Sequence, residues 1–127
     1  MYQRIWILAT AIACLASVLR AENVQVVKDA DAVKFVGRNV EVRGQVASVY
    51  IGKHGDAYVF FGAGYPKQTF TGYIPAGWTF SGGPWTRKLQ GQIISITGTV
   101  EMYKGKPEIK ILSMDQIKQT DSRSKAQ

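Results

Sequence analysis

Lysine and aromatic side chains are the residues of this sequence whose types and spacing could bind a ligand. The segment YKGKPEI, residues 103–109, places Tyr103, Lys104 and Lys106 around a glycine in a predicted tight turn. Two interpretations are open at this point. Lysines are common in solvated turns, or these two lysines form one edge of a groove for a polyanion, in which ammonium groups contact phosphates and rings stack on bases.

Catalytic residue patterns are scarce. The sequence has 1 histidine, His54, in a Gly-Lys-His-Gly turn, and 1 cysteine, Cys14, near the N-terminus. Only Asp56 is a carboxylate close to His54 in sequence, and the other carboxylates are dispersed. No acid/base pair, metal-ligand cluster or nucleophile motif is therefore predicted. We expect a protein that is not an enzyme and that uses no cofactor or metal.

The aromatic residues of two segments, 57–61 and 69–75, alternate as in half-buried strands. The faces that carry Phe61 and Ile74 are expected to form core, which places Tyr58, Phe60 and Tyr73 on the outer surface. These rings could form a surface on which bases stack. Alternatively, a long loop covers one or more of them with its own aromatic residues, Trp78, Phe80 and Trp85.

Further cations are expected beside this surface. Lys53 lies in the predicted turn at residues 52–56, and Arg43 is expected to point outward from the strand that precedes it. The predicted nucleic-acid-binding residues are Arg43, Lys53, Tyr58, Phe60, Tyr73, Tyr103, Lys104 and Lys106.

Five segments are predicted to form the strands that position these residues: 39–52, 57–62, 69–75, 92–103 and 108–112. Gly44 and Gly98 interrupt the first and fourth, where we expect bends that let a small sheet close into a barrel. The predicted fold is all-β, a five-stranded Greek-key barrel of the OB type. The side chains expected to point inward are Val42, Val46, Val59, Phe61, Ile74, Ile94, Ile96, Val100, Ile109 and Ile111.

The rest of the chain sets the domain organisation. Residues 29–40 predict a short helix or turn before the barrel, and residues 76–91 a long irregular connection. A length of 127 residues suits one domain, expected at residues 22–118 and followed by a polar tail at 119–127. The net charge of +7 favours anionic partners such as nucleic acid, lipid or acidic polysaccharide.

Residues 1–21 have the order of a secretory signal peptide. Arg4 precedes an apolar run that ends at Leu19, and small residues follow. Cleavage is expected after Ala21, with a cut near Ala16 as an alternative. A lipid-anchored form modified at Cys14 is a minority alternative, because the segment AIAC only loosely matches a lipoprotein box. The mature protein is then secreted or periplasmic.

Three segments carry a family resemblance: VGRNVEVRGQVASVYIGKHGDAYVFFG, YPKQTFTGYIP and LQGQIISITGTVEMYKGKPEIKILSMDQI. They resemble exported bacterial OB-fold domains of the nucleic-acid-binding, tRNA-anticodon-like type, over residues 36–118. The resemblance implies an OB-fold and, less directly, nucleic-acid binding. Phe60 departs from the family pattern, which usually has a small polar residue at that position.

Together these features predict an exported OB-fold protein that binds single-stranded nucleic acid with little sequence preference. Bases would stack on the face of the second and third strands, and turn lysines would contact phosphates. The alternative is a periplasmic OB module that binds an oligosaccharide or a protein partner, because aromatic rings stack on sugars as well as on bases. The sequence does not distinguish DNA from RNA and does not predict the oligomeric state.

Overall fold

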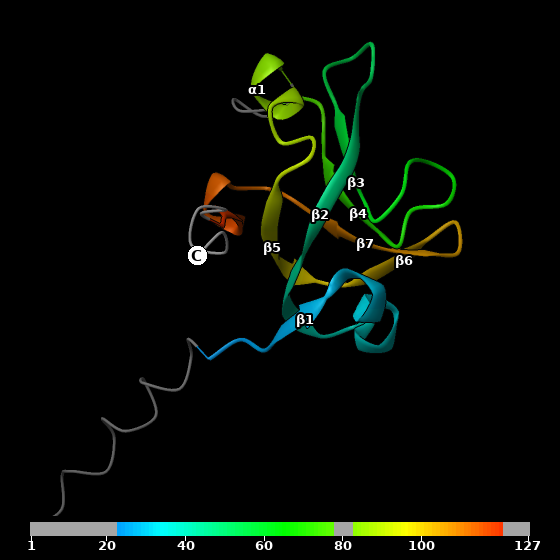
Figure 1. Ribbon diagram of the computed structural model, residues 1–127, viewed down its shortest axis with the longest axis vertical. Helices are drawn as coiled ribbons and strands as arrows, with labels where there is room; N and C mark the ends of the chain where they lie inside the picture. Colours follow the sequence, from blue (N-terminus) through cyan, green and yellow to red (C-terminus); the bar gives the residue numbers. More distant parts are fainter. Residues whose placement is uncertain (1–22, 78–82, 121–127) are drawn as a thin grey trace, which may run out of the picture.

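A computed structural model describes residues 23–77 and 83–120 of the chain (Figure 1). Within these residues the helical segments are short: η2 (Asp29–Phe35) and η3 (Met114–Gln116) are 3-10 helices, and α1 (Pro84–Arg87) is one α-helical turn. The rest of the regular structure is an eight-stranded sheet. Its strands are β1 (Val26–Lys28), β2 (Asn39–Ile51), β3 (Ala57–Phe61), β4 (Phe70–Ile74), β5 (Ile93–Thr99), β6 (Glu101–Tyr103), β7 (Lys106–Lys110) and β8 (Ile117–Gln119).

The sheet is strongly coiled but does not close. Its strands follow the order β6-β7-β4-β3-β2-β5-β8, with β1 paired to β2 in parallel outside this path. The long strand β2 pairs with β5 over residues 39–45 and with β3 over residues 46–51, so it belongs to both halves of the sheet (Figure 1). Only Val100 separates β5 from β6 in the chain. The sheet must therefore curl until β6, at one end of the order, comes back beside β5.

This arrangement corrects the prediction of five strands in a closed barrel. Strands β2, β3, β4 and β7 correspond to four predicted segments, and the predicted fourth strand is divided at Val100 into β5 and β6. Val100 instead forms an isolated bridge with Val36. The short strands β1 and β8 were not predicted. The predicted short helix is present as η2.

The core lies between the two halves of the curled sheet. All ten side chains that alternation predicted to point inward are at most 1% exposed. Phe70, Val40 and Leu89 join them, and the Phe61 and Phe70 rings pack edge to face with centroids 5.2 Å apart. Burial of this apolar area is the main stabilising contribution to such a small domain.

Gly44 and Gly98 have a different role from the predicted one. Both lie in the regular ladder between β2 and β5, and the register shift in β2 comes later, between Val46 and Ser48. A Cβ atom at Gly44 would lie 2.5 Å from the Asp29 Oδ1 atom, and one at Gly98 would lie 2.5 Å from an Ile109 methyl carbon. Gly44 therefore allows η2 to approach β2 closely, and Gly98 allows the Ile109 side chain of β7 to approach β5.

Residues 1–21, with Cys14 and the predicted cleavage sites, lie outside the described residues, and so do residues 121–127 of the predicted tail. In the part of the chain that the structure does describe, no helix has the length and hydropathy needed to cross a membrane.

Candidate nucleic-acid interface

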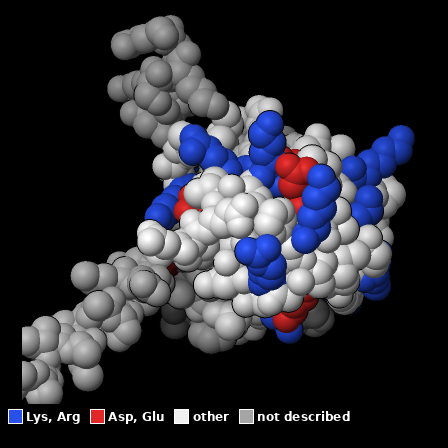
Figure 2. All heavy atoms as spheres, turned by 90° about the horizontal axis from the view of Figure 1, so that it is seen from below, with Lys and Arg blue, Asp and Glu red and all other residues white. Residues whose placement is uncertain are grey.

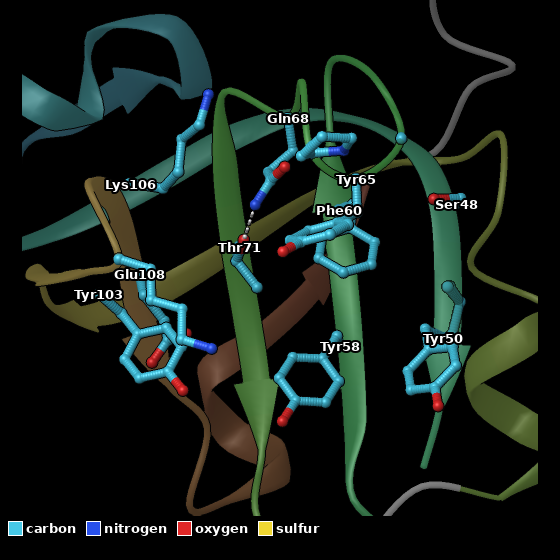
Figure 3. Close-up of a pocket in the computed structure, with 14 residues that line it drawn as sticks. Ser48, Tyr50, Tyr58, Phe60, Tyr65, Gln68, Thr71, Tyr103, Lys106 and Glu108 are labelled. Carbon is cyan, nitrogen blue, oxygen red and sulfur yellow. Dashed lines mark hydrogen bonds between the residues drawn. The ribbon is translucent and has the colours of Figure 1, made fainter.

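A groove of about 730 Å³ lies on the outer face of the sheet (Figure 3). Strands β2, β3, β4 and β7 form its floor, residues 64–68 close one end, and the turn after β6 forms one side. A second hollow of about 300 Å³ adjoins it and shares Tyr58, Tyr103 and Glu108. We call the larger hollow the groove.

Strand register arranges the floor in two rows that run across the strands. One row contains Tyr50, Tyr58 and Tyr73, which are successive pairing partners on β2, β3 and β4. We call it the tyrosine row. The ring centroids of Tyr50 and Tyr58 are 6.0 Å apart, and those of Tyr58 and Tyr73 are 4.9 Å apart. Side chains directly opposite each other on adjacent strands share a face, so the register itself brings these three rings together.

The second row lies two residues away from the first on each of β2, β3 and β4. It contains Ser48, Phe60, Thr71 and Glu108, on β2, β3, β4 and β7. We call it the mixed row. It joins the tyrosine row through the stacked pair Tyr58 and Phe60, whose centroids are 6.2 Å apart at an interplanar angle of 11°. An apolar ring, a hydroxyl and a carboxyl thus follow one another across the groove floor (Figure 3).

Phe60 lies on the outer face, as alternation predicted, but it is only 8% exposed. The Tyr65 ring packs against it, with centroids 5.8 Å apart, so the cover comes from residues 62–69. Trp85, one of the loop residues considered as a cover, packs against the main core instead. Trp78 and Phe80 lie outside the described residues. Phe60 therefore supports the neighbouring rings, and the exposed rings are Tyr50, Tyr65 and Tyr103.

The position of Tyr65 depends on a polar anchor at the base of its loop. The Thr69 hydroxyl donates a hydrogen bond to the Asp29 carboxylate, and its oxygen also lies 3.0 Å from the Phe61 carbonyl oxygen, which shares the same hydrogen. Asp29 belongs to η2, which precedes β2 in the chain, whereas the loop follows β3. The Asp29 side chain fits beside the loop because Gly44 and Gly62 lack side chains. The anchor holds residues 62–69 against the sheet.

The turn between β6 and β7 places positive charge at the side of the groove. Lys104 has φ +49° and Gly105 has φ +80°, which is the geometry of a type I′ hairpin turn. The Lys104 Nζ atom lies 5.4 Å from the centroid of the Tyr103 ring, within cation–π range. Lys106 also lines the groove, and its Nζ atom is directed away from the ring rows in Figure 3.

These lysines are available to a ligand. Among the residues that the structure describes, neither Lys104 nor Lys106 forms an ion pair. Figure 2 shows one face of the molecule, on which Lys and Arg side chains are more abundant than Asp and Glu. On this face the basic side chains are spread out rather than gathered in one patch.

Glu108 introduces a carboxyl group into the groove floor. It is 6% exposed. Burial, with a smaller contribution from the Glu101 charge on the neighbouring strand, raises the pKa of Glu108, while Lys110 opposes the shift. The floor therefore contains an enclosed acidic group beside the rings.

Tyr58 is held at the centre of the floor by Asp56. Burial, followed by a hydrogen bond from the phenol to the Asp56 carboxylate, raises the pKa of Tyr58 to about 12. Gly52 makes room for that carboxylate, since a Cβ atom there would lie 2.1 Å from the Asp56 Oδ1 atom. Burial and then the Asp56 charge also raise the pKa of Tyr73. Both phenols therefore remain neutral across the physiological pH range.

The structure brings most of the predicted site residues together. Tyr58, Phe60, Tyr103, Lys104 and Lys106 line the groove, and Tyr73 lines the adjoining hollow. Arg43 and Lys53 line neither: Arg43 lies in β2 opposite Ser95 of β5, and Lys53 is exposed in the turn between β2 and β3. His54, in the same turn, is also exposed.

Sequence reasoning did not predict the other residues that line the groove, and four of them matter most to the site: Tyr50, Tyr65, Gln68 and Glu108. Alternation could have identified Glu108, because Ile109 and Ile111 were expected to point inward. Alternation could not have identified Tyr50, because the register of β2 shifts between Val46 and Ser48. Tyr65 and Gln68 lie in a loop without periodicity, and no sequence signal places them.

No group of three or more His, Cys, Asp or Glu side chains that could hold a metal ion occurs within residues 23–77 and 83–120. The groove residues in that part of the chain can stack on, hydrogen bond to and attract a ligand by charge.

No family model matches the sequence, and no curated protein matches it. Among solved structures, the chain is similar to a protein assigned as an aspartyl-tRNA synthetase from Leishmania major Friedlin, with 12% identity and a TM-score of 0.52. That match covers 77% of this chain and 21% of the synthetase, so the chain corresponds to about a fifth of that protein's length.

Two further similarities are weaker. The aspartyl tRNA synthetase from Entamoeba histolytica has 17% identity and a TM-score of 0.48, over 75% of this chain and 21% of that one. OBody AM1L10, solved bound to hen egg-white lysozyme, has 22% identity and a TM-score of 0.46, over 70% of this chain and 85% of that one. At 12% identity, the match with a TM-score of 0.52 supports the OB-like fold alone, and the two weaker matches add nothing to this support.

Proposed function

We propose that this protein binds single-stranded nucleic acid along the groove, with bases on the exposed rings and phosphates near the turn between β6 and β7. One observation carries the proposal: exposed rings and unpaired lysines border the same groove. Tyr50, Tyr65 and Tyr103 are 59%, 68% and 52% exposed, although solvated tyrosines are ordinarily less favourable than buried ones. Stacking on such rings tolerates any base, and ammonium groups beside them can contact the phosphates of a nucleic-acid backbone.

The fold and the comparison are consistent with this proposal. The outer face of strands two and three is the usual ligand face of OB-folds; here those strands are β3 and β4, and both contribute residues to the groove. The solved structure with the highest TM-score quoted above is assigned to an enzyme that acts on tRNA. We further propose that the protein acts by binding rather than by catalysis, and that it is exported, as residues 1–21 predict.

A second candidate ligand is a neutral or weakly acidic oligosaccharide. Glu108 and Gln68 lie among aromatic rings in the groove, and carboxyl and amide groups beside aromatic rings can also bind sugar hydroxyls. A protein partner would use the same exposed rings. Salt dependence separates these ligands, because only a polyphosphate releases many condensed counterions on binding.

The experiment is a binding panel followed by fluorescence anisotropy across a range of salt concentrations. The ligands are a labelled single-stranded DNA, an RNA of the same sequence, the corresponding DNA duplex, a heparin-like polymer and a neutral glycan. We expect the single strands to bind more tightly than the duplex, with log K falling linearly against log salt. Failure of every nucleic acid to bind at low salt, with binding of the glycan, would overturn the proposal.

A further inference from the structure

Gln68 has a polar atom that lacks a partner at the end of the groove. The side chain is 5% exposed, and its Nε2 atom donates a hydrogen bond to the Thr71 hydroxyl at 3.3 Å (Figure 3). Its Oε1 atom is buried and has no hydrogen-bond partner among the residues that the structure describes. Buried amide oxygens almost always have a partner, so an orphaned one that lines a groove points to a ligand that completes it.

Glu108 provides a second enclosed acceptor in the same floor. It is the pairing partner of Thr71 across β4 and β7, and Thr71 accepts the hydrogen bond from Gln68. An ionised carboxylate accepts hydrogen bonds and donates none. The charged groups that act on it are Glu101 of β6 and Lys110 of β7. The floor beside the rings thus offers acceptors from two different elements.

Acceptors and cations occupy different parts of the groove. Lys104 and Lys106 lie at the turn that forms one side, whereas Gln68, Thr71 and Glu108 lie in the floor and at one end (Figure 3). A phosphate would be repelled by the floor and attracted to the side. A base that stacks on the rings would therefore face the floor with its edge, where a hydrogen-bond donor suits the Gln68 amide oxygen and the Glu108 carboxylate.

We propose that Gln68 and Glu108 bind the exocyclic amino group of a stacked base, so that the groove prefers amino-bearing bases to uracil and thymine. Cytosine presents an N4 amino donor where uracil presents the O4 carbonyl oxygen. That oxygen would face the acceptors of Gln68 and Glu108 without a hydrogen bond. The inference rests on the proposed function and refines the expectation of little sequence preference.

The test compares binding of oligo-deoxycytidine and oligo-deoxyuridine of equal length to the full mature chain by anisotropy. The two strands have equal charge, and their bases differ in donors and acceptors but not by a methyl group. We expect the cytidine strand to bind about tenfold more tightly, the scale of one good hydrogen bond to a charged acceptor. Equal binding of both strands, or tighter binding of the uridine strand, would overturn this inference while leaving the proposed function in place. Binding of neither strand would overturn both.

Two variants identify the residue responsible. Glu108→Gln replaces an acceptor-only group by an amide that can also donate, so the cytidine preference should fall to about twofold or less, with tighter binding of uridine. Glu101→Gln is the matched control, because it removes the same charge from an exposed neighbour. It should strengthen binding of both strands and leave their ratio unchanged. If Glu108→Gln keeps the full tenfold preference, Glu108 does not read the base. Thermal melts establish that both variants are folded.

Discussion

Glu108 has an unusual environment for a charged residue on the outer face of a sheet. It is a carboxyl group at 6% exposure in a floor of rings, opposite Glu101 on the adjacent strand. Like charges directly opposite each other on a sheet are destabilising, and burial adds to that cost. A residue of this kind at the centre of a groove is more easily explained by a ligand than by the fold.

The raised pKa of Glu108 predicts a pH dependence of stability. Because the folded chain holds the proton more tightly than the unfolded chain, the stability from protonation is fully present below the ordinary value of 4.5. It is lost as pH rises through the raised folded value. Glu108→Gln removes the ionisable group, and with it this loss of stability at higher pH. Urea unfolding should show the variant to be more stable than wild type at pH 7, with the difference shrinking as pH falls toward 4.5. A difference that is constant with pH would contradict the assignment.

Truncation of Phe60 should mainly lower the stability of the fold, whereas truncation of Tyr65 should mainly weaken binding. Phe60→Ala removes an enclosed ring, so we expect a loss of about 3 kcal/mol in the free energy of unfolding. Tyr65→Ala removes a ring that is 68% exposed but packs on Phe60, so stability should fall by less than in Phe60→Ala, by about 1 kcal/mol. The same change should weaken oligonucleotide binding by about 1–3 kcal/mol, the value of one stacked base. Chemical denaturation and anisotropy measure the two effects. Normal binding by Tyr65→Ala would remove that ring from the site.

At the scale of elements, the turn between β6 and β7 shows a conflict between local conformation and charge. Lys104 adopts φ +49°, a region in which residues other than Gly, Asn and Asp are disfavoured. Type I′ turns prefer Asn-Gly or Asp-Gly at the two central positions, and this chain has Lys-Gly. A ligand contact made by the positive charge of Lys104 would explain why lysine is present at this disfavoured φ.

Lys104→Asn should therefore stabilise the hairpin and weaken binding at the same time. We expect a gain of about 0.5–1 kcal/mol in the free energy of unfolding, within the usual range for such changes. The loss of one phosphate contact should lower the slope of log K against log salt by about 0.7. Lys53→Asn is the control, since Lys53 is an exposed turn residue outside the groove with an ordinary φ. A lower melting temperature for Lys104→Asn would show that the lysine has a structural role.

Strand prediction succeeded where alternation is long and failed where pairing is short. The buried positions of β2, β3, β4, β5 and β7 follow the apolar period of two, which is why the core was predictable. Strands β1 and β8 have three residues each, too few for a period to be recognised, whereas β6 was predicted as the end of a longer strand. The break at Val100 depends on its bridge to Val36, which is a tertiary contact.

At the scale of the whole molecule, the sequence predicted the outer face of the sheet better than the loop that covers part of it. Tyr58, Phe60 and Tyr73 lie on the outer face because strand alternation requires it. Burial of Phe60 beneath Tyr65 could not be predicted, because it depends on the path of residues 62–69 and on the Asp29–Thr69 hydrogen bond. Arg43 and Lys53 were expected beside the groove from an idealised barrel, and the coiled open sheet does not bring them to it.

Export is a property of the whole chain that the sequence predicts and the described residues do not test. N-terminal sequencing of the protein from periplasmic or extracellular fractions should give a mature start at Glu22. The charged, apolar and small residues occur in the order that signal peptidase requires. A start at Met1 in the cytoplasm would contradict the prediction, and lipid on Cys14 would indicate the anchored form.

The measurement that tests the central claim most directly is the salt dependence of single-strand binding in the double variant Lys104→Ala/Lys106→Ala. If these lysines contact phosphates, the slope of log K against log salt should be lower than that of wild type by about 1.4, since each contact contributes about 0.7. The matched control is Lys88→Ala/Lys118→Ala, which removes two exposed lysines that line neither hollow and should keep the wild-type slope. An unchanged slope in the groove variant, or an equal reduction in the control, would contradict a nucleic-acid site at this groove.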